Sequence, residues 1–229
     1  ETTNTGNNYL YIVEVEVYDS TPCNLTSGKL SSALYFDGTD DYVRGIVDNS
    51  ASLNINGAGS RVSVGAWFKA NTLAPTWQNI FYKGNSDSNC AETGCSDRQY
   101  TLWLNTAGYL AFQSTSINNI GVSPTVLNTP SGIISTGQWY HVVGVVDSVA
   151  GTMKVYVNGV EQARAAYSTT GIRSGTGAFF ISHPSNPFNG SIDEIAGWKR
   201  ALSAGEISGL YNGGSGLEIG TEALNCASG

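Results

Sequence analysis

The sequence predicts an all-β fold, a two-sheet antiparallel β-sandwich with one short helical turn near its C-terminus. Short runs rich in Val, Ile, Tyr, Phe and Trp recur along the chain and are separated by turn signals such as Asp37-Gly38 and Asn158-Gly159. Only one stretch has helical spacing. The 229 residues include 28 Gly and only 13% charged residues, a composition typical of an extracellular all-β protein with many turns.

The N-terminal region is expected to contain one strand and a polar joint. Residues 9–18 read YLYIVEVEVY, in which three valines alternate with Glu14 and Glu16, so this strand should have one wet face. We therefore divide the chain into residues 1–29, packed on or extending the sandwich, and a sandwich domain over residues 30–229.

Further strands follow from alternating apolar residues bounded by turns. One hairpin is clear from local sequence, because Asn158-Gly159 supplies the two positive φ angles of a type I′ turn. The expected strands are residues 33–36, 42–44, 61–69, 78–83, 100–105, 109–113, 139–147, 152–157, 161–165, 178–182 and 190–198.

The end of the chain combines a strand with a capped helical turn. In residues 189–198, alternation places Ile192 and Asp193 on opposite faces. Ser203 and Glu206 then have the spacing of a capping box, and Ile207 and residues 210–211 recur at helical intervals. The helical turn should pack across an edge of the sandwich.

Charge and hydropathy exclude two classes of partner. The formal charge of −7 argues against nucleic acid, which requires clustered Lys and Arg, and mildly favours cations. No apolar run approaches the roughly 20 residues that span a bilayer, so we expect no membrane insertion.

Four cysteines indicate an oxidising compartment. The simplest of the three connectivities pairs Cys90 with Cys95 and Cys23 with Cys226. Zinc binding by four thiolates is the alternative, although one CxxxxC pair and two distant single cysteines are poor zinc spacing. Disulfides would place the chain outside the cell or on its surface.

Seven segments in order carry a family resemblance. They are ALYFDGTDDYV (33–43), VSVGAWFKA (62–70), IFYKG (80–84), YTLWLNTAGYLAF (100–112), GQWYHVVGVVD (137–147), MKVYVNGVE (153–161) and FNGSIDEIAGWKRALSAGEISGLYN (188–212). Over about residues 30–213 the chain resembles the laminin G-like, concanavalin A-like jelly-roll family. The resemblance implies two stacked antiparallel sheets and an extracellular module that binds glycans or proteins, frequently with calcium, and it does not imply catalysis.

The same resemblance implies a calcium site where the beginning and end of the sheet run side by side. On the matching positions, Asp193 would supply a carboxylate and Gly38 a backbone carbonyl, with Asp37 or Asp40 as a second acid. Calcium prefers six to eight such oxygen ligands. In the alternative interpretation, Asp37 and Asp40 are turn-forming acids that bind local amides.

Aromatic residues define candidate ligand contacts. Trp67, Trp139 and Trp198 occupy positions where the resembled motifs use core side chains. Alternation instead turns Trp103 away from the core. We therefore expect glycan binding by residues that offer flat rings or fixed polar groups, namely Trp77, Arg98, Trp103 and Gln113. In the alternative interpretation, Trp103 covers a neighbouring loop or a subunit contact.

The expected function is therefore an extracellular, non-catalytic binding module for a glycan or an extracellular protein, with a structural calcium ion. A second class is a structural subunit of a pilin-like or other surface filament, which would self-assemble through the N-terminal strand. A glycoside hydrolase is a lesser alternative. Glu14 and Glu16 superficially resemble its paired acids, but they precede the recognised region and are explained by a solvated strand face.

Overall fold

The computed structural model of the protein describes residues 9–10, 15–18, 25–45, 54–73, 76–84, 98–119, 124–175 and 177–218. The four cysteines, Cys23, Cys90, Cys95 and Cys226, lie outside these residues, so their pairing stays a prediction.

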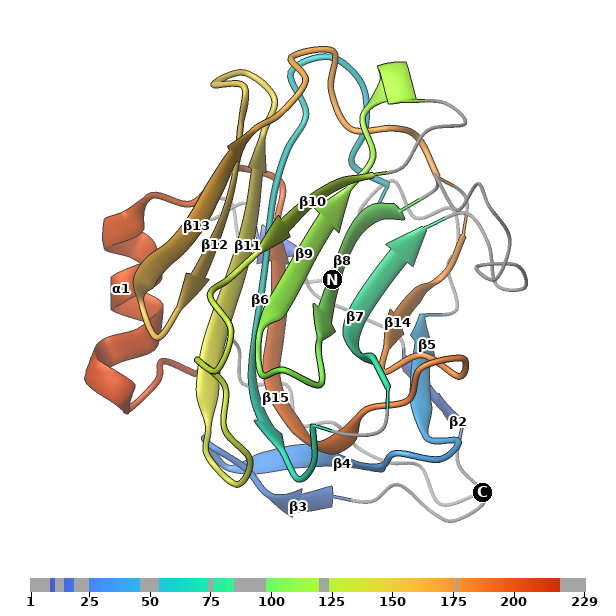
Figure 1. The fold of residues 1–229 in the computed structure, drawn as a ribbon, viewed down its shortest axis with the longest axis vertical. Coiled ribbons are helices and arrows are strands. Elements are labelled where there is room, and N and C mark those ends of the chain that lie inside the picture. Colours follow the sequence, from blue (N-terminus) through green and yellow to red (C-terminus); the bar gives the residue numbers. More distant parts are fainter. Residues whose placement is uncertain are drawn as a thin grey trace.

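Two antiparallel sheets form the molecule, as the sequence predicted (Figure 1). In spatial order, the first sheet contains β13 (Val160–Ala166), β12 (Thr152–Val157), β11 (Tyr140–Asp147), β6 (Arg61–Ala70), β15 (Asn189–Trp198), β4 (Ser32–Asp37) and β3 (Leu25–Ser27), and β1 (Tyr9–Leu10) also pairs with β15. The second contains β10 (Thr125–Asn128), β9 (Leu110–Ser114), β8 (Arg98–Leu104), β7 (Gln78–Gly84), β14 (Phe179–Ile181), β5 (Tyr42–Gly45) and β2 (Val15–Tyr18).

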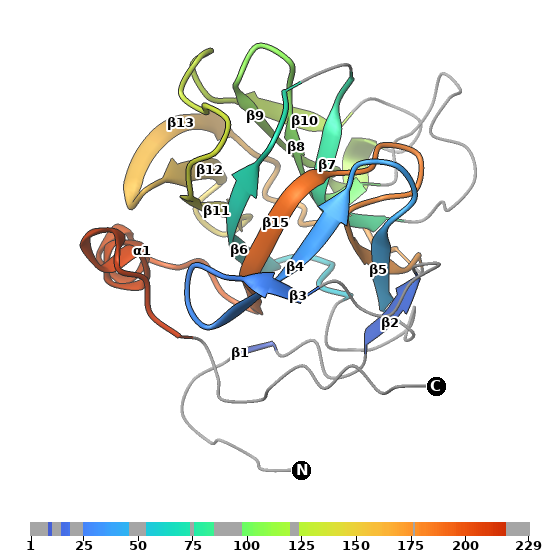
Figure 2. The ribbon, with the colours of Figure 1, turned by 90° about the horizontal axis from the view of Figure 1, so that it is seen from below.

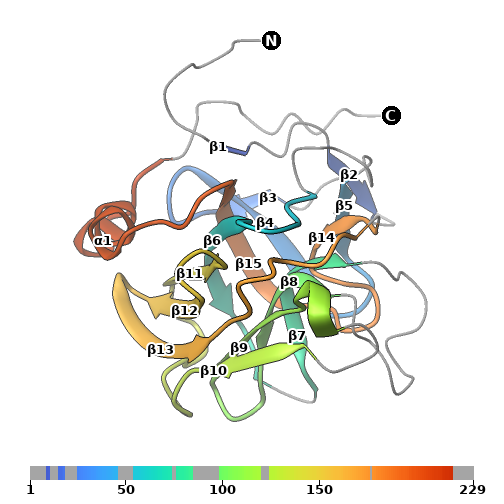
Figure 3. The ribbon, with the colours of Figure 1, turned by 90° about the horizontal axis from the view of Figure 1, so that it is seen from above.

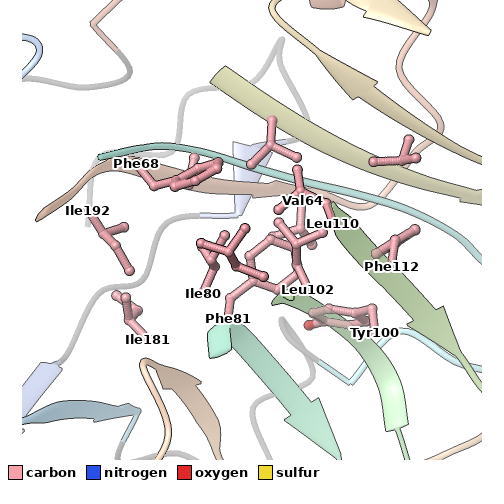
Figure 4. Packing of buried hydrophobic residues seen from close by; sticks show 14 of the residues in the cluster. Val64, Phe68, Ile80, Phe81, Tyr100, Leu102, Leu110, Phe112, Ile181 and Ile192 are labelled. Carbon is pink, nitrogen blue, oxygen red and sulfur yellow. The ribbon is translucent and has the colours of Figure 1, made fainter. Parts of the chain in front are cut away.

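The hydrophobic core lies between the sheets, which face each other as two layers in the end views (Figures 2 and 3). Val64 and Phe68 point inward from β6, and Leu102 and Phe112 point inward from β8 and β9 (Figure 4). The alternation of side chains across each strand therefore gives every sheet one face toward the core and one outer face. The outer faces carry the residues of functional interest.

The N-terminal region differs from the expected single strand over residues 9–18. β1 pairs with β15 in the first sheet, whereas β2 pairs with β5 in the second. Two sheets in a sandwich lie about 10 Å apart, so one continuous strand could not serve both. This region thus extends both layers within its own chain. Strands β3 and β10 and the 3₁₀ turn η1 (Ile117–Asn119) were not anticipated either.

A β-bulge interrupts β15 and corrects the expected alternation. Asp193 pairs with Trp67 and Ala196 with Gly65, so β15 contains one residue more than β6 between these pairs. Glu194 takes the positive φ of 48° that accommodates the insertion. Beyond the bulge, Ala196 therefore lies on the outer face with Asp193, where simple alternation would have turned it inward.

The predicted capping box is confirmed at helix α1 (Ala204–Tyr211), which is followed by the 3₁₀ turn η2 (Asn212–Gly214). Ser203 Oγ accepts from the Glu206 amide, and a Glu206 carboxylate oxygen accepts from the Ser203 amide at 2.8 Å. Ile207 and Leu210 are buried against Trp198 and its neighbours on the outer face of the first sheet. In Figure 1, α1 accordingly lies outside β12 and β13. With eight residues, it is far too short to cross a membrane, and no other described helix is long enough to do so.

Candidate functional site

An aromatic cluster covers the outer face of the second sheet. Tyr82 from β7, Trp103 from β8 and Phe180 from β14 form its buried part, and the half-buried Trp77 and Tyr109 pack against them. The rings meet edge to face, with the centroids of Tyr82 and Trp103 separated by 6.3 Å. Large aromatic side chains therefore occupy a sheet face that does not point into the main core.

Three of the four predicted glycan-binding residues meet on this face. Arg98 Nη1 donates to Gln113 Oε1, and the Arg98 guanidinium carbon lies 5.2 Å from the centroid of the Trp103 ring. The Trp103 indole donates to Thr101 Oγ1 at 2.8 Å, and this tryptophan is only 6% exposed. Trp103 therefore supports Arg98 from below, and the polar groups of Arg98 and Gln113 lie above it.

Trp77, the fourth predicted residue, lies toward one end of the same face. Its ring packs edge-on against Tyr109 at a centroid distance of 5.6 Å, and both side chains are half-buried. Trp77 therefore retains exposed ring surface, which Trp103 lacks.

The predicted acids of the 37–41 turn converge, and a further acid joins them. One carboxylate oxygen from each of Asp37, Asp40 and Asp41 lies within 4.8 Å of the others. Asp41 Oδ2 accepts from the Asp37 amide at 2.8 Å, while Gly38, with φ of 84°, forms the turn between the acids. Asp41 was not among the predicted ligands, although the pair Asp40-Asp41 is visible in the sequence.

Asp193 does not join this turn. Asn189 pairs with Asp37, which places Asp193 four residues farther along β15, about 13 Å away at strand spacing. Its Oδ2 accepts from the amides of Lys29 and Leu30 at 2.8 and 2.9 Å, and its Oδ1 accepts from the Glu194 amide. Burial raises the pKa of this carboxyl, and the three amides partly oppose that effect. Asp193 thus fastens the 28–31 turn to β15.

The tryptophans assigned to the core divide into two groups. Trp67 and Trp198 are buried, at 2% and 1% exposed, although both lie on the outer face of the first sheet. Trp139 is half-buried, and Lys69 Nζ lies 5.2 Å from its ring centroid. The core assignment of Trp139 is therefore wrong, because this residue precedes β11 and faces outward beside Lys69.

His141 packs in a stack of aromatic rings on the same face. Its ring lies 5.2 Å from that of Trp67 and 6.3 Å from that of Tyr211, by centroids. Burial lowers its pKa from 6.5 to about 4. At neutral pH, His141 is consequently an uncharged packing residue.

Comparison with known protein families gives one match. The family model of the concanavalin A-like lectin/glucanases superfamily matches residues 34–208. No curated protein matches the chain.

Several solved structures share the fold at low sequence identity. The binding domain of Paraclostridial Mosquitocidal Protein 1 superposes with a TM-score of 0.66 at 14% identity, covering 87% of this chain and 47% of that one. The ligand binding domain of botulinum neurotoxin serotype D, in complex with N-acetylneuraminic acid, gives 0.65 at 16%, covering 92% and 47%. This chain thus spans a little under half the length of those chains. Domain 4 of AbnA, an extracellular arabinanase from Geobacillus stearothermophilus, in complex with arabinotriose, gives 0.56 at 20%, covering 86% of each chain.

Proposed function

Because the chain belongs to the concanavalin A-like lectin/glucanases superfamily, we propose that it is an extracellular, non-catalytic module that binds glycans. The observation that carries this proposal is the outer face of the second sheet, where the buried Gln113 fixes the half-buried Arg98 guanidinium and, toward one end of the face, Trp77 and Tyr109 keep exposed aromatic surface. Sugar rings have apolar faces that stack on aromatic rings, and their hydroxyl groups require placed hydrogen-bond partners. Structural neighbours in complex with arabinotriose and with N-acetylneuraminic acid support the same class of ligand.

The residues of this face have different roles in the proposal. Trp77 provides the stacking surface, since its ring is partly exposed, whereas Trp103 holds Arg98 in place. Gln113 accepts from Arg98 and thereby fixes the guanidinium for hydrogen bonds to sugar hydroxyls or a carboxylate. A residue that contacts the ligand should affect affinity alone, whereas Trp103 should affect both affinity and stability.

A glycan array probed with the whole chain, followed by calorimetric titration of the best glycan, tests the proposal. Trp77→Ala should weaken binding at least tenfold, which corresponds to about 1.4 kcal/mol or more of binding free energy. It should do so without lowering the melting temperature. Val149→Ala is the matched control, because Val149 is 62% exposed in the turn after β11. If Trp77→Ala binds the glycan with wild-type affinity, the proposed site is rejected. If the wild type binds no glycan, the proposed function is rejected.

We also propose that the 37–41 turn binds a structural calcium ion. Calcium–oxygen distances of about 2.3–2.6 Å allow ligand atoms up to about 5 Å apart across the ion. Carboxylate oxygens of Asp37, Asp40 and Asp41 that lie within 4.8 Å of one another fit this requirement. Gly38 is in the same turn, whereas the pairing of Asn189 with Asp37 places Asp193 about 13 Å away along β15, too far to share this ion.

Calcium titration followed by thermal melting tests the ion. The wild-type melting temperature should rise with calcium and fall with chelator, and Asp40→Asn should abolish the response. Asp147→Asn is the matched control, since Asp147 also binds turn amides but lies outside the cluster. A calcium response that survives in Asp40→Asn would place the ion elsewhere.

The filament alternative predicts a different behaviour. The described parts of the N-terminal region, β1 and β2, pair within their own chain, which favours a monomeric module. Negative-stain images of the native protein distinguish the two: filaments without glycan binding would favour the structural subunit.

A further inference from the structure

We propose a second, separate ligand site on the outer face of the first sheet, specific for sugars that carry a carboxylate or sulfate group. It extends the proposed function, since it assumes a glycan-binding module, but it uses the opposite layer of the sandwich and different residues. The site consists of Tyr35, Ser191, Lys69 and Trp139, which we call the lysine strip, with Lys29 beside it.

The strand register places the strip in one row. Ser191 of β15 pairs with Tyr35 of β4 on one side and with Lys69 of β6 on the other. Phe68 pairs with Tyr140, so the next residue pair across these strands is Lys69 and Trp139. At about 4.8 Å per strand step, the row is about 14 Å long. This length suits a short oligosaccharide lying across the strands.

The rings of the strip are accessible. Tyr35, Lys69 and Trp139 are each half-buried, and helix α1 lies beside the strip, over Trp198 and Leu202 and, through Tyr211, against Trp67. Ser191 is buried, at 3% exposed, so the ligand would meet the two aromatic rings at the ends of the row and the ammonium group of Lys69 between them. These groups offer apolar surface and a hydrogen-bond donor together. The combination matches a sugar ring more closely than a purely apolar partner.

Two ammonium groups on this face favour a negatively charged ligand. Lys69 Nζ lies 5.2 Å from the Trp139 ring centroid, and Lys29 Nζ lies 5.0 Å from that of Trp67. Trp67 and Lys69 are two residues apart on the same face of β6. Lys29, which lies over Trp67, and Lys69 are therefore neighbours on this surface. Among the described residues, neither ammonium group has a carboxylate within 4.0 Å. The chain has 18 acidic and 11 basic residues, so two lysines on one surface that form no ion pair with the described residues are notable.

The described acids near this face, which include Glu218 close enough to raise the pKa of Asp193, form no ion pair with either lysine. Asp193 accepts three amide hydrogen bonds, and Asp37, two residues beyond Tyr35 on β4, accepts from the Thr39 amide at 2.7 Å. An anionic group on the ligand would therefore find both ammonium groups available, and its sugar ring would contact Trp139. Salt should weaken such binding, because the lysines are partly exposed and their charges are screened.

Binding of oligogalacturonate, a sulfated oligosaccharide and a neutral oligosaccharide of equal length to the whole chain tests the site. We expect an anionic probe to bind more tightly than the neutral one and to weaken with salt. Trp139→Ala and the double variant Lys29→Gln/Lys69→Gln should each weaken that binding at least tenfold. Val149→Ala is the matched control and should leave it unchanged. Trp77→Ala reports the contribution of the site on the other sheet. The double variant keeps the aromatic rings, so it tests the site even if Trp139→Ala fails to fold.

The outcomes separate this site from the proposed function. If the anionic probe loses affinity for the strip variants but not for the control, the second site is supported. The anionic probe that binds then identifies carboxylate or sulfate as the group recognised. Wild-type affinity in both strip variants, or equal binding of the neutral probe, overturns it. Trp77-dependent binding without any contribution from the strip would leave the proposed function intact and reject the second site. Absence of binding to every glycan would reject both.

Discussion

His141 should make the folded state sensitive to mild acid. The residue is 3% exposed, and burial lowers its pKa from 6.5 to about 4. The unfolded chain therefore takes up this proton near pH 6.5, whereas the folded chain takes it up only near pH 4. The unfolded state binds more protons across that window, so the free energy of unfolding falls as the pH is lowered. The gap corresponds to about 3 kcal/mol in total, lost at about 1.4 kcal/mol per pH unit.

His141→Phe removes the titrating group and keeps a ring between Trp67 and Tyr211. We expect urea unfolding, followed by tryptophan fluorescence between about pH 7 and pH 4.5, to show a steeper stability loss in the wild type than in the variant. Asp193 acts with the opposite sign, because burial raises its pKa and protonation then favours the folded state. Its contribution is common to both proteins and cancels in the difference. Parallel pH profiles of the two proteins would refute the reasoning.

Three substitutions test the packing. Gly28→Ala would bring a methyl group to 2.6 Å from Asp193 Oδ2, so it should lower stability by about 1–3 kcal/mol, and unchanged urea midpoints would argue against the fastening of the 28–31 turn. Gly144→Ala would place its methyl 2.5 Å from the Phe112 ring in the core and should likewise lower the thermal midpoint; a stability equal to wild type would mean that the sheets can move apart at no cost. Ser203→Ala removes the helix cap and should cost about 1 kcal/mol in urea unfolding, whereas no loss would indicate that α1 is held by its apolar contacts alone.

Most of the fold could be predicted because its signals are local. The turn at Asn158-Gly159 and the capping box at Ser203 depend on residues close in sequence, and both occur as expected. β3 and β10 were missed because they are edge strands of three and four residues with too few alternating positions to stand out. Short edge strands are fixed by their partners rather than by their own sequence.

The candidate sites were less predictable because they depend on register. Alternation places Trp103 with Thr101 on the outer face, and the pairing of Thr101 with Gln113 adds the glutamine. Arg98 joins them only because the β7–β8 register shifts between Tyr100 and Arg98, which no local pattern predicted. The separation of Asp193 from Asp37 follows from the pairing of β15 with β4, which no local pattern specifies. Exposure was the other difficulty: a half-buried Trp139 and a buried Trp103 reflect what packs against each ring, which sequence spacing does not encode.

The bulge at Glu194 changes which residues of β15 face outward. Before it, Ile192 faces the core and Asp193 faces outward; after it, the residues that face outward are those which uninterrupted alternation would have buried. Removing the one extra residue at the bulge would restore even pairing with β6 and leave Trp198, which anchors α1, on the outer face. Removing a residue from the regular part of β15, with the bulge kept, would instead turn Trp198 into the space between the sheets. The length of the regular part of β15 should therefore tolerate less change than its composition, whereas a one-residue deletion at the bulge itself should be accommodated.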